Sequence, residues 1–383
     1  MNEKKISIAY VAPVLLSFFV MSFCDLVGVG VDNAKADFEL NNTLAQLIPM
    51  AAFAWFFILS VPIGIFQDRT GKRKMLNIGI LLTAFGLIMP FFFYSYGIVL
   101  AGFALLGIGN TIIQVSANPL LIDVVPSSKA SSFLSMSQFV KSVGSMVAPY
   151  LASYFAVVFG DWKLLFLVFG GISLLSVVWL HFTYITETYT QGEKATLVSC
   201  LKLLGIGYIA LMVLGIFFMV GLDVGINSSS GQFLLDKIDM ASEPAKQGRS
   251  LYFFGKMLGT FIGAILLTRF SSTKFLLGSS ISTLIAVLAL ILSPIPALAL
   301  TLMFLIGLAA SNIFPLIFSI TVKKYPLRAS EISGLMIMAI SGGALVPPVV
   351  GKITDLYSIT AGMYVFVVCS LYLLFVSLYS LKK

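Results

Sequence analysis

Long apolar stretches recur along the whole chain and constrain its fold more than any other feature. About 20 consecutive apolar residues in a helix cross the hydrocarbon core of a bilayer. Hydrophobic residues make up 59% of the chain and charged residues only 10%, against about 45–50% and about 25% in soluble domains. The sequence therefore predicts an all-α membrane protein with twelve transmembrane helices. They are expected near residues 6–30, 43–67, 75–95, 97–122, 131–158, 163–184, 202–229, 248–269, 274–294, 296–320, 330–350 and 358–380.

Basic residues are distributed unevenly between the two ends of these predicted helices. Lys4, Lys5 and the cluster at residues 69–74 fall on one side, together with Lys323 and Lys324. Segments rich in Lys and Arg stay in the cytoplasm. Both termini are therefore predicted to be cytoplasmic, which requires an even number of spans. The same rule accounts for the net charge of +8, so no nucleic-acid partner is expected.

The two halves of the chain resemble each other at a nearly constant offset. Asp25 in the segment CDLVG recurs as Asp223 in LDVG, and the segment SVGSMVAP at residues 142–149 recurs as SGGALVPP at residues 341–348. Parallel repeats of six helices place a binding site at their interface, near the middle of the membrane. The expected domains are a six-helix bundle at 1–185, a cytoplasmic linker at 186–201 and a second six-helix bundle at 202–383.

The segment after the second predicted helix, residues 64–74, reads GIFQDRTGKRK. It resembles the cytoplasmic signature of the major facilitator superfamily, G-x-x-x-D-R-x-G-(K/R)-(K/R). We expect Gly64 to allow close helix packing, Gly71 to supply a tight turn, and Asp68 to bond a helix N-terminus until the bundles move. Arg69 and Arg73 complete this gating motif. A solvated basic loop that follows the charge rule is the alternative interpretation.

Further segments resemble the fucose/glucose/galactose–proton symporter family of that superfamily. QVSANP at residues 114–119 resembles E-x-x-A-N-P, and QFVKSVG at residues 138–144 resembles Q-x-x-N-S-x-G; GKMLG, PLIFS and SGGALVPP are similar to family segments in the second half. The resemblance implies sugar uptake by alternating access, in which an acidic residue of the first helix and a glutamate of the fourth handle the proton. Here Gln114 replaces that glutamate and Lys141 replaces a sugar-contacting Asn, so the coupling ion, proton or sodium, and the sugar stay open.

Four ionisable side chains lie well inside the predicted spans: Asp25, Lys141, Asp223 and Lys256. A charge at a helix centre costs roughly 2.5–3.5 kcal/mol on insertion scales, which favours a functional role. Asp25 and Asp223 are the candidate ion-coupling residues, and Lys141 and Lys256 are candidates for substrate binding. The alternative is two structural ion pairs, Asp25–Lys141 and Asp223–Lys256.

Amide side chains complete the candidate substrate site, because each offers donors and acceptors to sugar hydroxyls. Bonds between helices are the alternative for each of them. The amides are Gln114, Asn118, Gln138, Asn227 and Asn312. Aromatic rings could stack on a sugar or simply pack. Those considered are Phe23, Trp55, Phe139 and Phe254.

No motif of an enzyme, a metal site or an ATP-binding loop is recognised, and the three cysteines are far apart. We therefore expect a secondary transporter with no cofactor besides the coupling ion. Its predicted function is import of a monosaccharide or sugar derivative, as a multi-pass protein of the bacterial inner membrane. The family resemblance implies a monomer. The alternatives are an exporter or antiporter of an anionic or amphipathic molecule, and a non-transporting receptor on the same scaffold.

Overall fold

The computed structural model describes residues 7–126, 130–187, 196–266 and 271–381, and these residues are helical apart from short connections. The first half of the chain forms eight α-helices and one 3-10 helix. They are α1 (Ile8–Met21), η1 (Ser22–Leu26), α2 (Val27–Asp37), α3 (Asn42–Ala45), α4 (Leu47–Thr70), α5 (Lys72–Phe92), α6 (Tyr96–Val124), α7 (Ala130–Phe159) and α8 (Leu164–Phe182).

The second half repeats this pattern with different interruptions. Its elements are α9 (Leu197–Leu203), α10 (Gly207–Asp236), α11 (Ser242–Leu266), α12 (Ser272–Leu292), α13 (Pro296–Ala310), α14 (Ile313–Lys324), η3 (Pro326–Arg328), α15 (Ala329–Met338), η4 (Ala339–Ser341), α16 (Gly342–Leu356) and α17 (Ile359–Leu381). The short helix α9 includes the end of the predicted linker and packs on α15.

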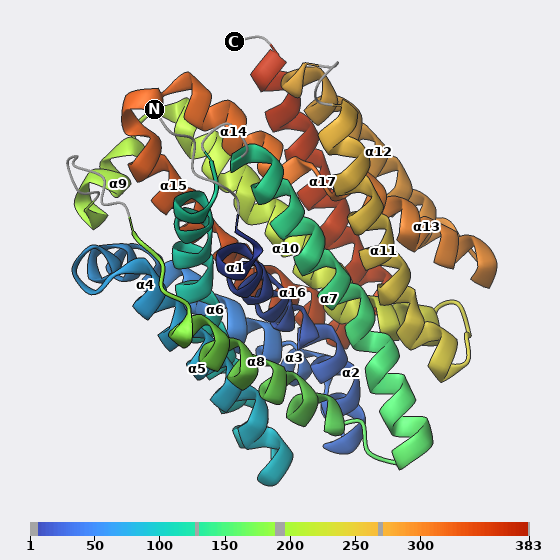
Figure 1. Cartoon of the computed structure of the whole chain (residues 1–383). Helices are drawn as coiled ribbons and strands as arrows, with labels where there is room; N and C mark the ends of the chain where they lie inside the picture. Colours follow the sequence, from blue (N-terminus) through green and yellow to red (C-terminus); the bar gives the residue numbers. More distant parts are fainter. Residues whose placement is uncertain (1–6, 127–129, 188–195, 267–270, 382–383) are drawn as a thin grey trace.

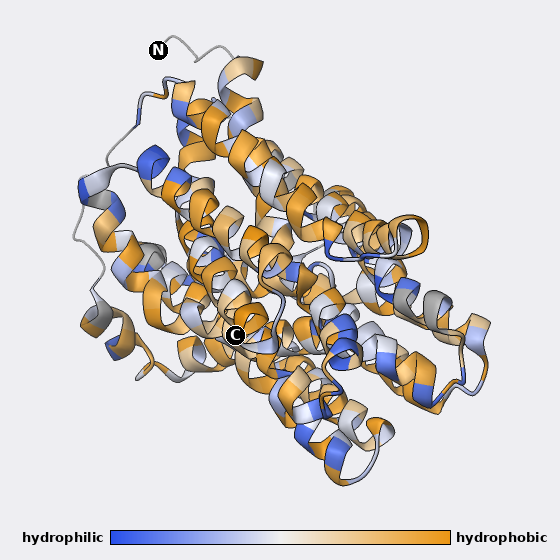
Figure 2. Ribbon diagram, turned by 90° about the horizontal axis from the view of Figure 1, so that it is seen from below, coloured by the Kyte–Doolittle hydropathy of each residue, from blue (hydrophilic) through white to orange (hydrophobic). Residues whose placement is uncertain are grey.

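Eleven helical stretches in the described residues are long and apolar enough to cross a membrane. They account for eleven of the twelve predicted spans. The remaining helix, α11, has 25 residues and packs lengthwise on α13 and α7, but it carries Arg249 and Lys256 and falls outside that set. Figure 2 shows apolar residues along most of the ribbon, with hydrophilic segments at helix ends and turns.

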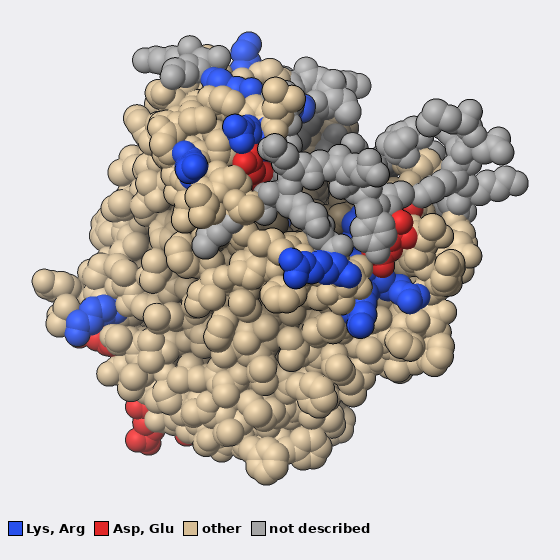
Figure 3. Space-filling model, turned by 90° about the vertical axis from the view of Figure 1, so that its left-hand side faces the viewer, with Lys and Arg blue, Asp and Glu red and all other residues tan. Residues whose placement is uncertain are grey.

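The helices pack as two bundles. One buried apolar cluster runs through residues of both halves of the chain, and a second lies within residues 222–369. In the first, α1 packs on α6, α7 and α8, and α5 packs on α6 and α8; in the second, α10 packs on α16 and α17, and α11 on α13. The bundles meet where α7 lies against α11, α4 against α15 and α16, and α2 against α10. The start of α1 and the end of α17 lie toward the same end of the molecule, which we call the end of the termini (Figure 1). On the face shown in Figure 3, Lys and Arg gather toward that end, and the opposite part is largely uncharged.

Two of the membrane-length stretches contain a 3-10 segment, and both segments contact the other bundle. The first changes from α-helix to 3-10 helix at Ser22–Leu26, and the Nδ2 of Asn110 donates to the carbonyl oxygen of Met21 at 2.7 Å. A second interruption, at Ala339–Ser341, separates α15 from α16. Backbone groups released inside a membrane need partners in the protein, and interrupted helices of this kind surround the sites of carriers. The breaks therefore mark the middle of the molecule as the candidate site.

Candidate functional site

Asp25 lies on the 3-10 segment that interrupts the first membrane-length stretch. It is partly exposed, whereas every other residue from 20 to 31 is buried. Its Oδ2 accepts a hydrogen bond of 2.5 Å from the Oγ of Ser145 on α7. A single carboxylate reached by solvent inside a buried stretch is the arrangement expected of a residue that binds an ion or a solute.

Asp223 repeats this arrangement on α10. It is the one partly exposed residue between positions 219 and 231, all the others being buried. The Nζ of Lys256 lies 2.5 Å from its Oδ2, and the hydroxyl of Tyr252 donates to its Oδ1. Both partners come from α11. The ion pair Asp223–Lys256, the alternative interpretation of these two residues, is present, and it neutralises this carboxylate within the second bundle.

The other predicted ion pair does not form. In the described part of the chain, neither Asp25 nor Lys141 takes part in a salt bridge. Lys141 is half-buried and lies one helical turn before Ser145, whose hydroxyl contacts the backbone oxygen of Lys141 at 3.2 Å. The two residues share one face of α7, and Ser145, one turn further along the helix, is the one that lies level with the carboxylate.

Side chains from both bundles converge at Asp25. The Nδ2 of Asn227 on α10 donates to the backbone oxygen of Asp25 at 2.8 Å. Gly28 permits this approach, since a Cβ there would overlap Asn227. Ser145, which bonds Asp25, lies on α7, and α7 packs on α11, the helix that supplies both partners of Asp223. The two carboxylate sites therefore form one polar region between the bundles.

The remaining amides divide between helix packing and the candidate site. Asn312 is buried, and its Nδ2 donates to the backbone oxygen of Gly259 at 2.7 Å, so it joins α14 to α11. Gln114 and Asn118 are half-buried and Gln138 is exposed; within the described residues their side chains have no protein hydrogen-bond partner. These three stay available to a solute, whereas Asn312 serves the interior of its bundle.

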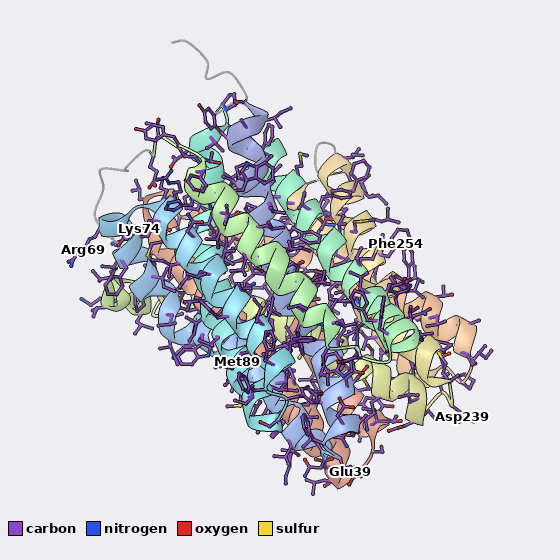
Figure 4. The ribbon with its side chains drawn as sticks, turned by 60° about the horizontal axis from the view of Figure 1, so that its bottom comes forward. Glu39, Arg69, Lys74, Met89, Asp239 and Phe254 are labelled. Carbon is purple, nitrogen blue, oxygen red and sulfur yellow. The ribbon has the colours of Figure 1, made fainter. Side chains whose placement is uncertain are left out.

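The aromatic candidates mostly pack against other rings. Phe23 is fully buried and stacks on Phe169 with ring centroids 4.1 Å apart. Phe254 lies against Phe304 and points away from the bundle interface (Figure 4). These two are packing residues, whereas Phe139 is 41% exposed on the same helix as Lys141.

The tight turn expected of the basic loop is present. Gly71 has a φ of 95°, a backbone conformation that glycine adopts readily. Directly after it, the amides of Lys72 and Arg73 donate to the two carboxylate oxygens of Glu187, at 2.6 and 3.1 Å. The Nη1 of Arg73 also donates to the backbone oxygen of Thr183 at 2.5 Å. A carboxylate thus caps the N-terminus of α5 and ties the loop to the end of α8.

Other parts of the gating motif differ from expectation or stay untested. No atom would lie within 4 Å of a Cβ at Gly64, so the predicted close approach of helices there is wrong for this conformation. The side chain of Asp68 lies outside the described residues. Arg69 is exposed, and Lys72 pairs with Asp123 at 2.6 Å, within the same bundle.

A buried ion pair joins the bundles at the end opposite the termini. The Nη2 of Arg249 on α11 lies 2.6 Å from the Oδ2 of Asp32 on α2, and the side chains are 2% and 10% exposed. Asp32 also lies against Gly231 of α10, where a Cβ would collide with its carboxylate. This contact forms only when α2 is pressed against α10 and α11.

Asp355 makes a second connection at the same end. Its carboxylate accepts from the backbone and side chain of Asn42, at 2.9 and 2.6 Å, and from those of Thr43, at 2.7 and 2.6 Å. Deeper in the same interface, the Nε2 of Gln46 lies 3.3 Å from the Oγ of Ser229. The bundles are thus held together at the end bearing α2 and α3.

Sequence reasoning did not single out the residues of this outer contact. One signal was available: Arg249, Tyr252 and Lys256 follow each other at helical spacings of three and four residues, so one face of α11 carries all three polar groups. Their partners, Asp32 and Asp223, lie on different bundles, and no local pattern assigns them.

Paired charges and an accessible carboxylate between two multi-span helical bundles define a membrane transporter rather than an enzyme. The family model of the Major Facilitator Superfamily matches residues 13–234. The chain belongs to this superfamily.

Full-length relatives agree with the resemblance to the fucose/glucose/galactose family. A glucose/galactose transporter of Brucella abortus is 28% identical, covering 100% of this chain and 96% of that protein. A putative glucose/galactose transporter of Helicobacter pylori is 26% identical over 96% of this chain and 95% of its own length. Among solved structures, the Escherichia coli fucose:proton symporter has a TM-score of 0.70 at 19% identity, covering 97% of this chain and 99% of that one. A D-xylose-proton symporter has a TM-score of 0.78 at 15% identity, with 99% and 98% coverage.

Proposed function

We propose that this protein is a secondary transporter that imports a monosaccharide or sugar derivative, driven by a cation gradient, across a bacterial plasma membrane. The main support is that Asp25 and Asp223 are the partly exposed residues of two buried helical runs, and that Asp25 lies where Asn227 of the second bundle contacts the first. The glucose/galactose transporters that match along almost the whole chain favour a sugar. The proposal includes twelve spans and cytoplasmic termini.

Asp25 is the better candidate for the coupling residue. Asp223 is already neutralised by Lys256, whereas the carboxylate of Asp25 is bonded to the neutral hydroxyl of Ser145. A proton bound at Asp25 would remove its charge and let the carboxyl group donate a hydrogen bond in turn. A proton needs only this one carboxylate, whereas hard metal cations take several oxygen ligands. We therefore favour proton coupling over sodium coupling.

Alternating access then consists of opening one end of the bundle interface while closing the other. The contacts Asp32–Arg249 and Asp355–Asn42 close the end opposite the termini, so this conformation would give access from the cytoplasm. Opening the outer end requires those contacts to break, and solute and proton at the central site would set the balance between the two states.

Counterflow in proteoliposomes with labelled glucose, galactose and their amino and acid derivatives tests the proposed function. We expect at least one of these sugars to exchange, and to accumulate when an inward pH gradient is imposed. In the variant Asp25→Asn, accumulation should be lost while exchange persists, because exchange needs no net proton movement. The matched control is Asp161→Asn, which removes an exposed carboxylate paired with Lys163. Accumulation by Asp25→Asn at the level of the unmodified protein would exclude Asp25 as the coupling residue.

A further inference from the structure

Lys141 is a charged side chain of the central site that the proposed coupling does not use. It is half-buried on α7, one turn from the serine that bonds Asp25. Within the described residues its ammonium group has neither a hydrogen bond nor an ion pair. An uncompensated cation inside a membrane span is costly, and such a residue marks a ligand site by default.

The charged and polar groups near Asp25 come from three elements: its own 3-10 segment, α7 and α10. Cys24 shares its 3-10 segment, Lys141 lies on α7, and the neutral amide of Asn227 on α10 contacts its backbone. Tyr252 and Lys256 of α11 both contact Asp223. Asp223 and Lys256 offset each other at 2.5 Å. What is left is one negative charge, at Asp25, and one positive charge, at Lys141.

Binding of a proton at Asp25 upsets this balance. The carboxyl group becomes neutral, and the site keeps one positive charge with no partner. A solute with one negative charge restores neutrality by binding to the ammonium group, whereas a neutral hexose does not. Proton and anion each make the other's binding more favourable, and this coupling is necessarily mutual.

We propose that the substrate is an anionic sugar derivative whose carboxylate binds Lys141 when Asp25 carries a proton. This rests on the proposed function and narrows its substrate class. Hydroxyl groups of the same solute would meet the amides without protein partners, Gln114 and Asn118. The transported unit, one anion and one proton, carries no net charge, so transport is electroneutral. A neutral sugar carried with one proton would instead move one positive charge.

The test uses the full-length protein in proteoliposomes with labelled D-glucuronate and labelled D-glucose. We expect glucuronate to accumulate under an inward pH gradient with the membrane potential held at zero by potassium and valinomycin. A potential negative inside, imposed without a pH gradient, should leave glucuronate accumulation unchanged. Glucose transport without glucuronate transport would overturn this inference and leave the proposed function standing. Glucuronate uptake driven by the potential would also overturn it, and transport of neither glucuronate nor any sugar in the proposed panel would overturn both.

Substitutions at Lys141 test whether the anion binds to this residue. Lys141→Asn should weaken glucuronate counterflow by roughly ten- to a hundredfold in apparent affinity, the range of a hydrogen bond to a charged group. Lys141→Arg keeps the charge and should stay within a few-fold of the unmodified protein. Lys352→Asn, which removes an exposed lysine of α16, is the matched control. A variant that keeps full glucuronate affinity would show that the anion binds elsewhere.

Discussion

Replacing Asp32 by Asn should open the end of the molecule that is closed in this structure. The substitution removes the negative charge facing Arg249, whose side chain is 2% exposed. Removing one partner of a buried ion pair costs about 3–5 kcal/mol, because the other charge is left without compensation. The two residues belong to different bundles, so this cost falls on the closed state and disappears once the bundles separate and water reaches Arg249. The equilibrium should therefore shift at least about a hundredfold toward the state open at this end.

A distance between the two outer loops measures this shift. Glu39 and Asp239 are exposed and lie on different bundles at the end opposite Arg69 and Lys74 (Figure 4). Spin labels at cysteines introduced in place of Glu39 and Asp239, in a variant without the three native cysteines, report this distance by double electron–electron resonance. The parent should show one short distance, and Asp32→Asn should add or substitute a longer one.

Asp161→Asn is the matched control for this shift. Asp161→Asn breaks the pair with Lys163, whose side chains are 37% and 27% exposed. An exposed pair contributes about 0–1 kcal/mol, and this one lies within one bundle, so the distance should stay short. If Asp32→Asn leaves the distance distribution of the parent unchanged, the buried pair does not hold the outer end closed.

Three further predictions concern other contacts. Gly28→Ala places a Cβ on Asn227. It should therefore prevent closure of the outer end and lower the counterflow rate at least about tenfold. An unchanged rate would show that the bundles need not approach at this position. Glu187→Ala removes the acceptor for two backbone amides of α5 and should lower the free energy of unfolding by about 1 kcal/mol. The melting temperature in detergent should therefore fall, and an equal melting temperature would contradict the capping role. Burial raises the pKa of the Cys200 thiol, and the negative Glu331 adds to the shift. The thiolate, which reacts with maleimide, forms only as the pH passes the pKa. In a variant lacking the other two cysteines, the rate of maleimide labelling of Cys200 should therefore keep rising above pH 9. A rate that reaches a plateau below pH 8 would contradict this.

Much of the site could be named from the sequence, because charges inside apolar stretches are few. Asp25, Asp223, Lys141 and Lys256 were all identified in this way, and all four are partly exposed near the bundle interface. The turn at Gly71 also followed from the motif alone. Asp32 was not predicted to be functional because it lies near a helix end, where a charged side chain is expected to be solvated.

The bonding partners of these residues could not be predicted from the sequence. The sequence alone determined the helical membrane fold and its internal repeat, since span length and the offset between repeats are properties of the chain itself. Only the tertiary structure decided that Asp25 bonds Ser145 rather than Lys141, and that Arg249 reaches across to Asp32. The physical reason is that an ion pair depends on the placement of each helix, around and along its axis, and on how closely the bundles approach. Both are set by packing among residues more than a hundred positions apart, which no local pattern records.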